Sequence, residues 1–306
     1  MTFLSVLAAL LAEHTWPLRE DNRLLVWFER YAAALERGLN GGQYRHGMLA
    51  WALAAGPVLA ATAAIQNLLG EVSVLAELAW NIVVLYAAMG FRRFGREFTE
   101  IEAALRAGEL AAARDRLGKW RGGSAAELEV GEAARVAIEQ GLIASHHRVF
   151  GPIAWFIVLG PAGAVLYRVC AVLSSLWGAR NDPDFGAFGR FAAQAFHWLD
   201  WIPVRLTAAS FATAGDFADA VYCWRAQASG WDPHANGIIL ASGGGALGVR
   251  LGDPLHQDGG LRYRPELGTG EEADVEHMRQ AAGLVWRALV LWVFLIFVVS
   301  LAHALG

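Results

Sequence analysis

The stretch "MLAWALAAGPVLAATAAIQNLLGEVSVLAELAWNIVVLYAAMGF", residues 48–91, decides the class of fold. It contains two apolar runs, 48–69 and 72–91, and each is close to the roughly 20 residues that a helix needs to cross a bilayer. Only the short turn "LGE" separates them. The sequence therefore predicts a transmembrane helical hairpin.

The composition of the whole chain agrees with a membrane protein. Of its 306 residues 56% are hydrophobic and 18% are charged, and the mean hydropathy of +0.34 is too high for an ordinary soluble domain. A net charge of −4 gives no basic surface of the kind that binds DNA or RNA. We therefore expect no nucleic-acid partner. The two cysteines show no spacing typical of zinc ligands, so we also expect no metal site.

The remaining chain divides around this hairpin into one membrane domain, 1–306. Residues 1–47 predict an N-terminal amphipathic region, and 92–148, rich in Ala, Glu and Arg, predict a helical hairpin on the cytoplasmic side. That side follows from the arginines that flank the two spans, because positive charge is retained in the cytoplasm. Residues 179–282 carry the later motifs, also on the cytoplasmic side, and 283–305 predict a final transmembrane helix.

The apolar run 149–178 carries "GPAG" in its middle, at 160–163. Glycine and proline permit a kink or a re-entrant turn there if neighbouring protein satisfies the freed backbone groups. The fold class that we expect is thus all-α: a polytopic protein of the inner (cytoplasmic) membrane, with helical cytoplasmic segments and with broken or re-entrant helices around a polar cavity.

Four motifs in this order resemble a known group of proteins: "FGPIAWFIVLGPAGAVLYR", "FGRFAAQAFHWLDWIPVRLTA", "GGGALGVRLGD" and "YRPELGTGEEADVEHMRQAAGLVWRA". They are similar to the CobD/CbiB and AmpE superfamily of integral membrane proteins. The CobD/CbiB branch contains adenosylcobinamide-phosphate synthases, which join aminopropanol phosphate or a related amine to adenosylcobyric acid at the expense of ATP. The AmpE branch is linked to signalling around β-lactamase induction.

The chain departs from the synthase pattern where the synthases carry polar residues. Ala144, His147, Ser174, Phe196 and His197 stand at such positions, and at these would-be catalytic positions the chain is closer to AmpE. The C-terminal "GALGVRLGD" and "YRPELGTG" are closer to CobD/CbiB.

These departures favour an AmpE-like membrane protein that is a non-catalytic sensor or regulatory component of cell-envelope or β-lactamase signalling. The alternative is an adenosylcobinamide-phosphate synthase that forms an amide bond with ATP. We expect no cofactor in the first case and Mg-ATP in the second. The partners would be the lipid bilayer, an anionic small molecule and a signalling protein that the sequence does not identify.

The stretch "FHWLDWIPVRL" places a carboxylate and a guanidinium on either side of Pro203. Asp200 and Arg205 either fix helix packing as a buried pair or contact a ligand. We expect Arg205, Arg250 and Arg264 to converge on one cavity that Asp200 partly neutralises. No catalytic residue is assigned; the ligand-binding candidates are Arg148, Tyr167, Arg168, Asp200, Arg205, Gly245, Gly248, Arg250, Arg264 and Glu266.

Overall fold

The computed structural model describes residues 1–15, 23–180, 182, 185–257 and 260–305. Its contacts divide the chain into two compact units, and each unit is built from two separate stretches of sequence. Unit 1 comprises Met1–Gly90 and Gly151–Pro203, and unit 2 comprises Phe91–Phe150 and Val204–Gly306.

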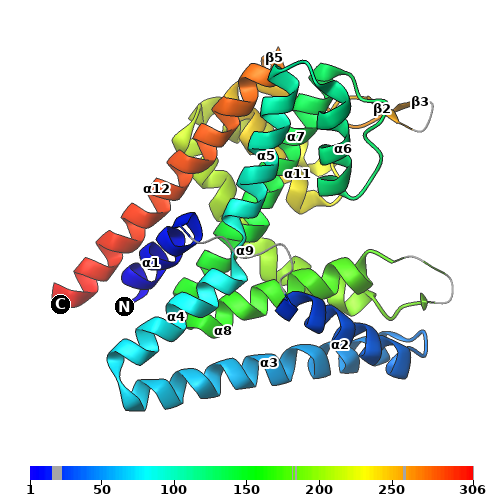
Figure 1. Cartoon of the computed structure of the whole chain (residues 1–306). Coiled ribbons are helices and arrows are strands. Elements are labelled where there is room, and N and C mark those ends of the chain that lie inside the picture. Colours follow the sequence, from blue (N-terminus) through cyan, green and yellow to red (C-terminus); the bar gives the residue numbers. More distant parts are fainter. Residues whose placement is uncertain (16–22, 181, 183–184, 258–259, 306) are drawn as a thin grey trace. The chain divides into compact units, whose positions relative to one another are not determined.

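Unit 1 consists of helices, most of them apolar (Figure 1). They are α1 (Thr2–Thr15), α2 (Arg23–Leu39), α3 (Tyr44–Val72), α4 (Val74–Ala88), α8 (Gly151–Leu173), the π-helical turn η2 (Ser174–Gly178) and the first half of α9 (Arg190–Ala214). On α3 the buried residues Ala50 and Ala54 lie one turn apart, and Trp177 and Phe188 fill the core around them. Small residues on one face of a helix allow neighbouring helices to approach closely.

Helices α3 and α4 form a hairpin in the predicted region, but the turn lies slightly later than expected and α4, at 15 residues, is shorter than the roughly 20 that a span needs. The chain breaks at Ser73, whose hydroxyl oxygen accepts a hydrogen bond from the Leu75 backbone N–H at 3.2 Å. Serine is a favoured N-cap because its side chain satisfies a free N–H of the first helical turn. Asn81 of α4 is buried, as a polar side chain within an apolar hairpin requires.

Helix α8 reverses direction at Gly160, which confirms the predicted break at "GPAG". Gly160 has φ 63° and ψ −151°, a backbone conformation that is essentially restricted to glycine. A Cβ on Gly151 would overlap the Tyr167 ring, and a Cβ on Gly163 would overlap the Trp155 carbonyl oxygen. In a straight helix Gly151 and Tyr167 would lie about 24 Å apart. The two arms on either side of Gly160 therefore pack against each other.

Unit 2 contains the motifs "GGGALGVRLGD" and "YRPELGTGEEADVEHMRQAAGLVWRA", whereas most of the other two motifs lies in unit 1. Its helices are α5 (Phe91–Arg106), α6 (Leu110–Arg121), α7 (Val130–Ser145), the π-helical turn η1 (His146–Phe150), the second half of α9, α10 (Phe217–Gln227), the 3₁₀ turn η4 (Ala228–Gly230), α11 (His234–Leu247) and α12 (Val275–Leu305). Three helices, α5 to α7, occupy the region where a hairpin was predicted, because the chain turns at Gly108 as well as at Gly122. Both glycines have positive φ, which favours glycine at the end of a helix.

Five short strands follow α11. Strand β1 (Val249–Leu251) pairs with β4 (Leu267–Gly268) in antiparallel and with β5 (Glu271–Glu272) in parallel orientation. Strands β2 (Leu255–Gln257) and β3 (Gly260–Arg262) form a separate hairpin. At two or three residues each, these strands carry no periodic pattern that sequence analysis could detect.

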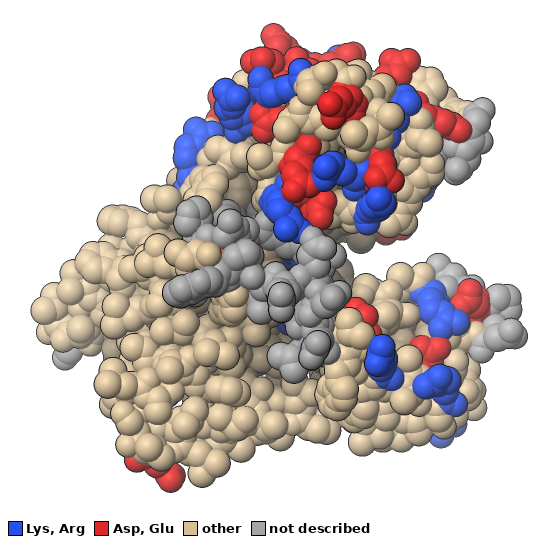
Figure 2. Space-filling model, in the orientation of Figure 1, with Lys and Arg blue, Asp and Glu red and all other residues tan. Residues whose placement is uncertain are grey.

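Three helical segments are long and apolar enough to cross a membrane: Tyr44–Val72, Val130–Gly178 and Val275–Leu305. The second includes the reversal at Gly160. On the face shown in Figure 2, charged side chains gather over α5 and α6 of unit 2, whereas the surface over the hairpin of α3 and α4 is largely uncharged. The predicted all-α polytopic fold is therefore confirmed.

Candidate functional site

The most densely bonded polar cluster described in unit 2 begins on helix α7. Glu129 and Glu132 close the first turn of α7 with a capping box, each side chain accepting a hydrogen bond from the other residue's backbone N–H. Arg135 and Glu139 follow four residues apart, so both lie on one face of the helix. Both are buried, and Glu139 is only 5% exposed. A buried carboxylate needs hydrogen bonds and a counter-charge to compensate its lost hydration.

The backbone corner after β1 supplies the first of these bonds. Gly252 donates its N–H to Glu139 Oε1 at 2.8 Å. Gly252 has φ 75°, and a Cβ there would overlap the Pro265 carbonyl oxygen, so only glycine fits. Asp253 also has positive φ, at 62°, and continues the corner. The motif "VRLGD" thus brings its backbone against the face of α7.

Arg264, from the motif "YRPELG", supplies the counter-charge. It donates to Glu139 from Nη1 at 2.6 Å and from Nη2 at 3.0 Å. It also donates to the carbonyl oxygens of Gly252 at 2.5 Å and Asp253 at 3.0 Å, and its guanidinium lies 5.3 Å from the centre of the Trp231 ring. A planar guanidinium is suited to this two-point geometry. Arg264 therefore joins the corner to α7.

Arg135 makes a second link to the same corner. Its Nη2 donates to the Pro254 carbonyl oxygen at 2.7 Å, and its Nη1 lies 3.5 Å from Asp253 Oδ2. Sequence analysis missed Arg135, Glu139 and Asp253 as site residues. The available signal was an arginine and a glutamate four residues apart in the otherwise apolar run "AARVAIEQGLIA".

A second polar contact lies within unit 1 and joins two of the predicted residues. The Tyr167 hydroxyl, on the second arm of α8, donates to Asp200 Oδ1 of α9 at 2.8 Å. Both side chains are buried, and Asp200 is 2% exposed. The Trp155 indole N–H donates to the Leu199 carbonyl oxygen at 3.0 Å and attaches α9 to the first arm as well. Asp200 is thus held where both arms of α8 meet α9.

The other predicted residues are distributed over both units. Arg250 pairs with Glu272, its neighbour on β5, at 3.0 Å, so Arg250 and Arg264 bind different acids. Gly245 allows α11 to pack on α10, because a Cβ there would lie 2.6 Å from the Asp219 carbonyl oxygen. Unit 1 also holds Arg168, and unit 2 holds Arg148, Arg205, Gly248 and the exposed Glu266. A cavity shared by Arg205 and Asp200 would involve both units and stays a prediction.

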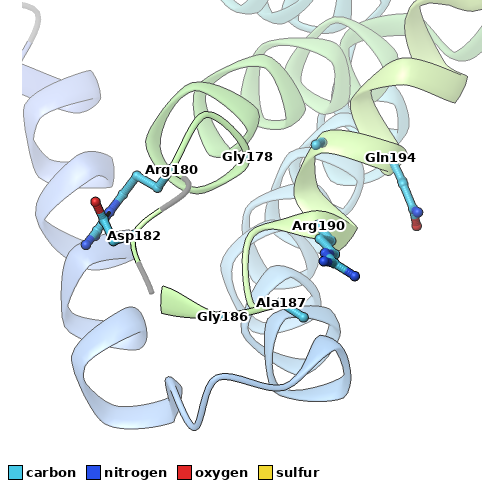
Figure 3. Close-up of a pocket in the computed structure, with 8 residues that line it drawn as sticks. Gly178, Arg180, Asp182, Gly186, Ala187, Arg190 and Gln194 are labelled. Atoms are coloured by element: carbon cyan, nitrogen blue, oxygen red, sulfur yellow. Dashed lines mark hydrogen bonds and ion pairs between the residues drawn. The ribbon is translucent and has the colours of Figure 1, made fainter. Parts of the chain in front are cut away.

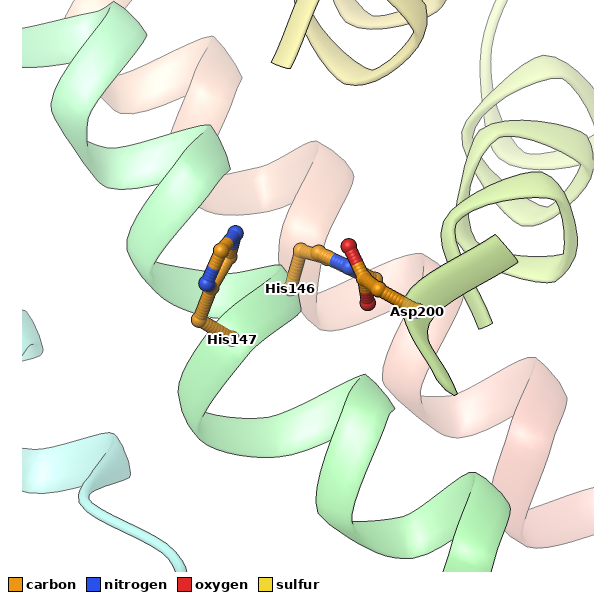
Figure 4. Close-up of side chains that lie close together, drawn as sticks. All are labelled: His146, His147 and Asp200. Atoms are coloured by element: carbon orange, nitrogen blue, oxygen red, sulfur yellow. The ribbon is translucent and has the colours of Figure 1, made fainter. Parts of the chain in front are cut away.

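The histidine pair of unit 2 lies in the turn η1 (Figure 4). His146 is buried, and its Nδ1 lies 2.9 Å from the Thr207 hydroxyl oxygen. The rings of His146 and His147 are 5.0 Å apart and nearly perpendicular.

A cavity of about 570 Å³ lies in unit 1 around the start of α9 (Figure 3). Among the residues that line it, Arg180 donates to Asp182 at 2.8 Å and to Glu36 of α2 at 2.6 Å. These acids neutralise Arg180, and none of the predicted site residues is among the described residues that line this cavity.

Comparison with known proteins identifies relatives of the whole chain. The family model described as "CobD/Cbib protein" matches residues 6–285. The chain is 38% identical over 298 residues to a "Cobalamin biosynthesis protein CobD" of Stutzerimonas stutzeri, covering 96% of both chains. It is 36% identical to a protein of that name from Chromobacterium violaceum, covering 84% of this chain and 76% of the relative. A "Cobalamin biosynthesis protein CbiB" of Salmonella choleraesuis is 24% identical, covering 69% of each chain. No solved structure matches the chain.

These relatives contradict the expectation of an AmpE-like sensor or regulatory component. All three are named for cobalamin biosynthesis. The expectation rested on replaced polar residues such as Phe196, His197 and Ser174, which were taken to mean that the chemistry was lost. The polar network around Glu139 does not include any of those replaced positions. The protein therefore keeps buried polar groups although Phe196, His197 and Ser174 replace polar residues.

Proposed function

The chain belongs to the CobD/CbiB family, and we propose that it is the membrane-bound adenosylcobinamide-phosphate synthase of cobalamin biosynthesis. In this reaction a carboxyl group of adenosylcobyric acid and the amine of aminopropanol phosphate form an amide bond, and ATP supplies the free energy. The observation that carries the proposal is the 38% identity to a cobalamin biosynthesis protein over 96% of both chains. At that coverage the likeness includes every element that builds the polar network of unit 2.

The polar network supports an enzyme that handles anionic substrates. Phosphate-bearing molecules require guanidinium groups or other cations to offset their charge. Unit 2 contributes Arg135 and Arg264, which the backbone corner holds in fixed positions beside Asp253 and Glu139, so that their net charge is small but their geometry is set. Groups that are positioned before the substrate binds do not have to be reorganised during the reaction.

Mg²⁺ would accompany ATP, and carboxylate oxygens are its usual protein ligands. Glu139 does not fit this role in the described arrangement, because Oε1 accepts from Gly252 and Arg264, and Oε2 accepts from Arg264. Asp253 does not fit the role of a Mg²⁺ ligand either, because the carboxylate lies beside the positive charge of Arg135. We therefore assign no Mg²⁺ ligand and no step that depends on the ion.

The spanning helices and the family place the protein in a lipid bilayer. We further propose the inner (cytoplasmic) membrane, a multi-pass topology and a cytoplasmic position for residues 92–148. Arginines near both ends of the first hairpin support this orientation. Cysteine labelling from outside intact cells at Gly123, an exposed glycine whose Cβ would meet no neighbour, tests it. Labelling there by a reagent that does not cross the membrane contradicts the orientation.

The direct test of function is growth of a bacterium that lacks its own synthase and depends on new cobalamin. Expression of this chain should restore growth, and membranes that contain it should convert adenosylcobyric acid, aminopropanol phosphate and Mg-ATP to the amide. Arg116→Gln alters an exposed ion pair with Glu100 and serves as a control that should still support growth. The strain should also grow when the amide product is supplied. Normal membrane levels of this chain without growth or product would overturn the proposal.

A further inference from the structure

Arg121 ends helix α6 with a guanidinium that the described structure does not satisfy. The residue is half-buried, and Gly122 follows it as a left-handed C-cap. Its Nη1 atom is buried and has no hydrogen-bond partner among the described residues. A cation suits the negative end of a helix, but a buried donor without an acceptor is unfavourable. The site therefore lacks an acceptor.

The charged groups around Arg121 are mostly of the same sign. Burial lowers its pKa, Arg264 and the exposed Arg262 lower it further, and Glu139 opposes them. Glu139 offers little to Arg121, because both of its oxygens already accept hydrogen bonds from Arg264 and Gly252. Arg121 on α6 thus experiences the positive charges of Arg262 on β3 and of Arg264 in the loop after β3, while Arg264 already engages the one acid that opposes them.

We propose that Arg121 and Arg262 bind a phosphate group of an anionic ligand, with Arg264 contributing positive charge to the site. A phosphate offers several acceptor oxygens and matches the planar array of guanidinium donors. It would supply the acceptor that Arg121 lacks and would offset the excess of positive charge. The inference rests on the proposed function only for the kind of ligand, since the synthase uses phosphate-bearing substrates.

Thermal unfolding of the whole purified protein in detergent tests the site without requiring turnover. Inorganic phosphate, pyrophosphate and ATP are titrated against sodium chloride at constant ionic strength, because salt screens exposed charges. Each phosphate compound should raise the unfolding midpoint of the wild type, as a ligand that binds the folded state must. Arg121→Gln should weaken that response about tenfold or more, the size expected for one charge-assisted hydrogen bond.

Two further variants make the outcome decisive. Arg116→Gln, on the same helix, should respond to phosphate like the wild type, whereas Arg262→Gln should respond more weakly. Arg262 is exposed, so its replacement tests the site even if Arg121→Gln unfolds. An equal phosphate response in the wild type, Arg121→Gln and Arg262→Gln overturns the proposal and leaves water as the acceptor for Arg121.

The source of the phosphate is distinguished in nanodiscs. If a phosphatidic acid headgroup raises the midpoint and Arg121→Gln removes that rise, the ligand is a lipid. A response to soluble phosphate in zwitterionic nanodiscs assigns a soluble ligand. The two proposals fail separately: phosphate binding that depends on Arg121 without synthase activity sinks only the proposed function, and synthase activity without such binding sinks only this site.

Discussion

Arg264 and Glu139 form a two-point ion pair that joins residues 125 positions apart in the sequence, with N–O distances of 2.6 and 3.0 Å. Both side chains are nearly enclosed, at 11% and 6% exposure. Water is thus largely excluded from the charges, and each charge depends on the other for compensation.

Removal of one partner should therefore be strongly destabilising. Arg264→Ala and Glu139→Gln should each lower the free energy of unfolding by about 3–5 kcal/mol, because the remaining group stays buried without its counter-charge. Denaturant unfolding in detergent measures this change. The matched control is Glu272→Gln at the exposed Arg250 pair, which should cost less than about 1 kcal/mol. Similar losses at both pairs would contradict the assigned burial.

Substitution of Gly160, where α8 reverses direction, should lower the stability of the protein although no neighbouring atom blocks a new side chain. Gly160→Ala forces a residue with a Cβ into a backbone region that favours glycine, at a cost of about 1–3 kcal/mol. Gly283→Ala in α12 is the control, since a Cβ there meets nothing within 4 Å and alanine favours a helix. Its unfolding midpoint should stay level or rise. Equal midpoints for the two variants would argue against the fold-back at Gly160.

The hydrogen bond between Tyr167 and Asp200 should contribute measurably to stability. Tyr167→Phe keeps the ring that packs on Gly151 but removes the hydroxyl donor from a buried carboxylate, at a cost of about 1–3 kcal/mol. Replacement of both residues, Tyr167→Phe with Asp200→Asn, should cost less than the sum of the single changes, because the two share one interaction. Strict additivity in this double-mutant cycle would show that the hydroxyl does not bond Asp200.

The outer face of α9 should contact lipid although hydropathy does not mark this helix as a span. In the part of α9 that belongs to unit 1, this face carries five exposed residues: Gln194, His197, Trp198, Trp201 and Ile202. Trp198 is 72% exposed. Tryptophan favours the interface of a membrane. An NBD dye on Trp198→Cys should be quenched by brominated lipid, and the same dye on Gln194→Cys should be quenched less. Equal weak quenching at both positions would place this face in water.

The N-terminal cap of α12 should make the stability of the protein depend on pH in the acidic range. Burial alone would raise the pKa of Asp274, but hydrogen bonds from the backbone and side chain of His277 and from the Glu276 backbone outweigh it and lower that pKa. A carboxyl group with a depressed pKa in the folded state stabilises above its ordinary pKa near 3.8, and this stability is lost as the pH falls through the folded value. Asp274→Ala should cost about 1 kcal/mol at neutral pH.

Asp274→Asn separates the cap from the charge. Asparagine keeps a side-chain oxygen for the first helical turn but does not titrate, so stability between pH 5 and about pH 3 should fall less than in the wild type. Unfolding midpoints across that range measure the difference. Identical profiles for the wild type and Asp274→Asn would exclude Asp274 as the source.

The apolar helices that sequence analysis found could be predicted because each carries its signal locally, although α4 is shorter than a span. The runs 48–69 and 72–91 became α3 and α4, and "GPAG" marked the reversal of α8. The site could be predicted only in part. Arg264 was identified from its motif, but its partner Glu139 lies 125 residues earlier, and no local pattern encodes such a contact. Arg250 seemed equivalent to Arg264 in the sequence, yet strand alternation turns it away from buried Val249 and Leu251, towards Glu272.

The separation between Glu139 and Arg264 also has a consequence for biogenesis. At about 5–20 residues per second, the ribosome adds the intervening 125 residues in roughly 6–25 s. During that interval α7 can form, but the guanidinium that neutralises its carboxylate has not been synthesised. The nascent helix must keep Glu139 hydrated or bind it to another group until the C-terminal third emerges. A ribosome that stalls before codon 264 would therefore leave a chain whose Glu139 lacks its partner Arg264, a ready substrate for membrane quality-control proteases.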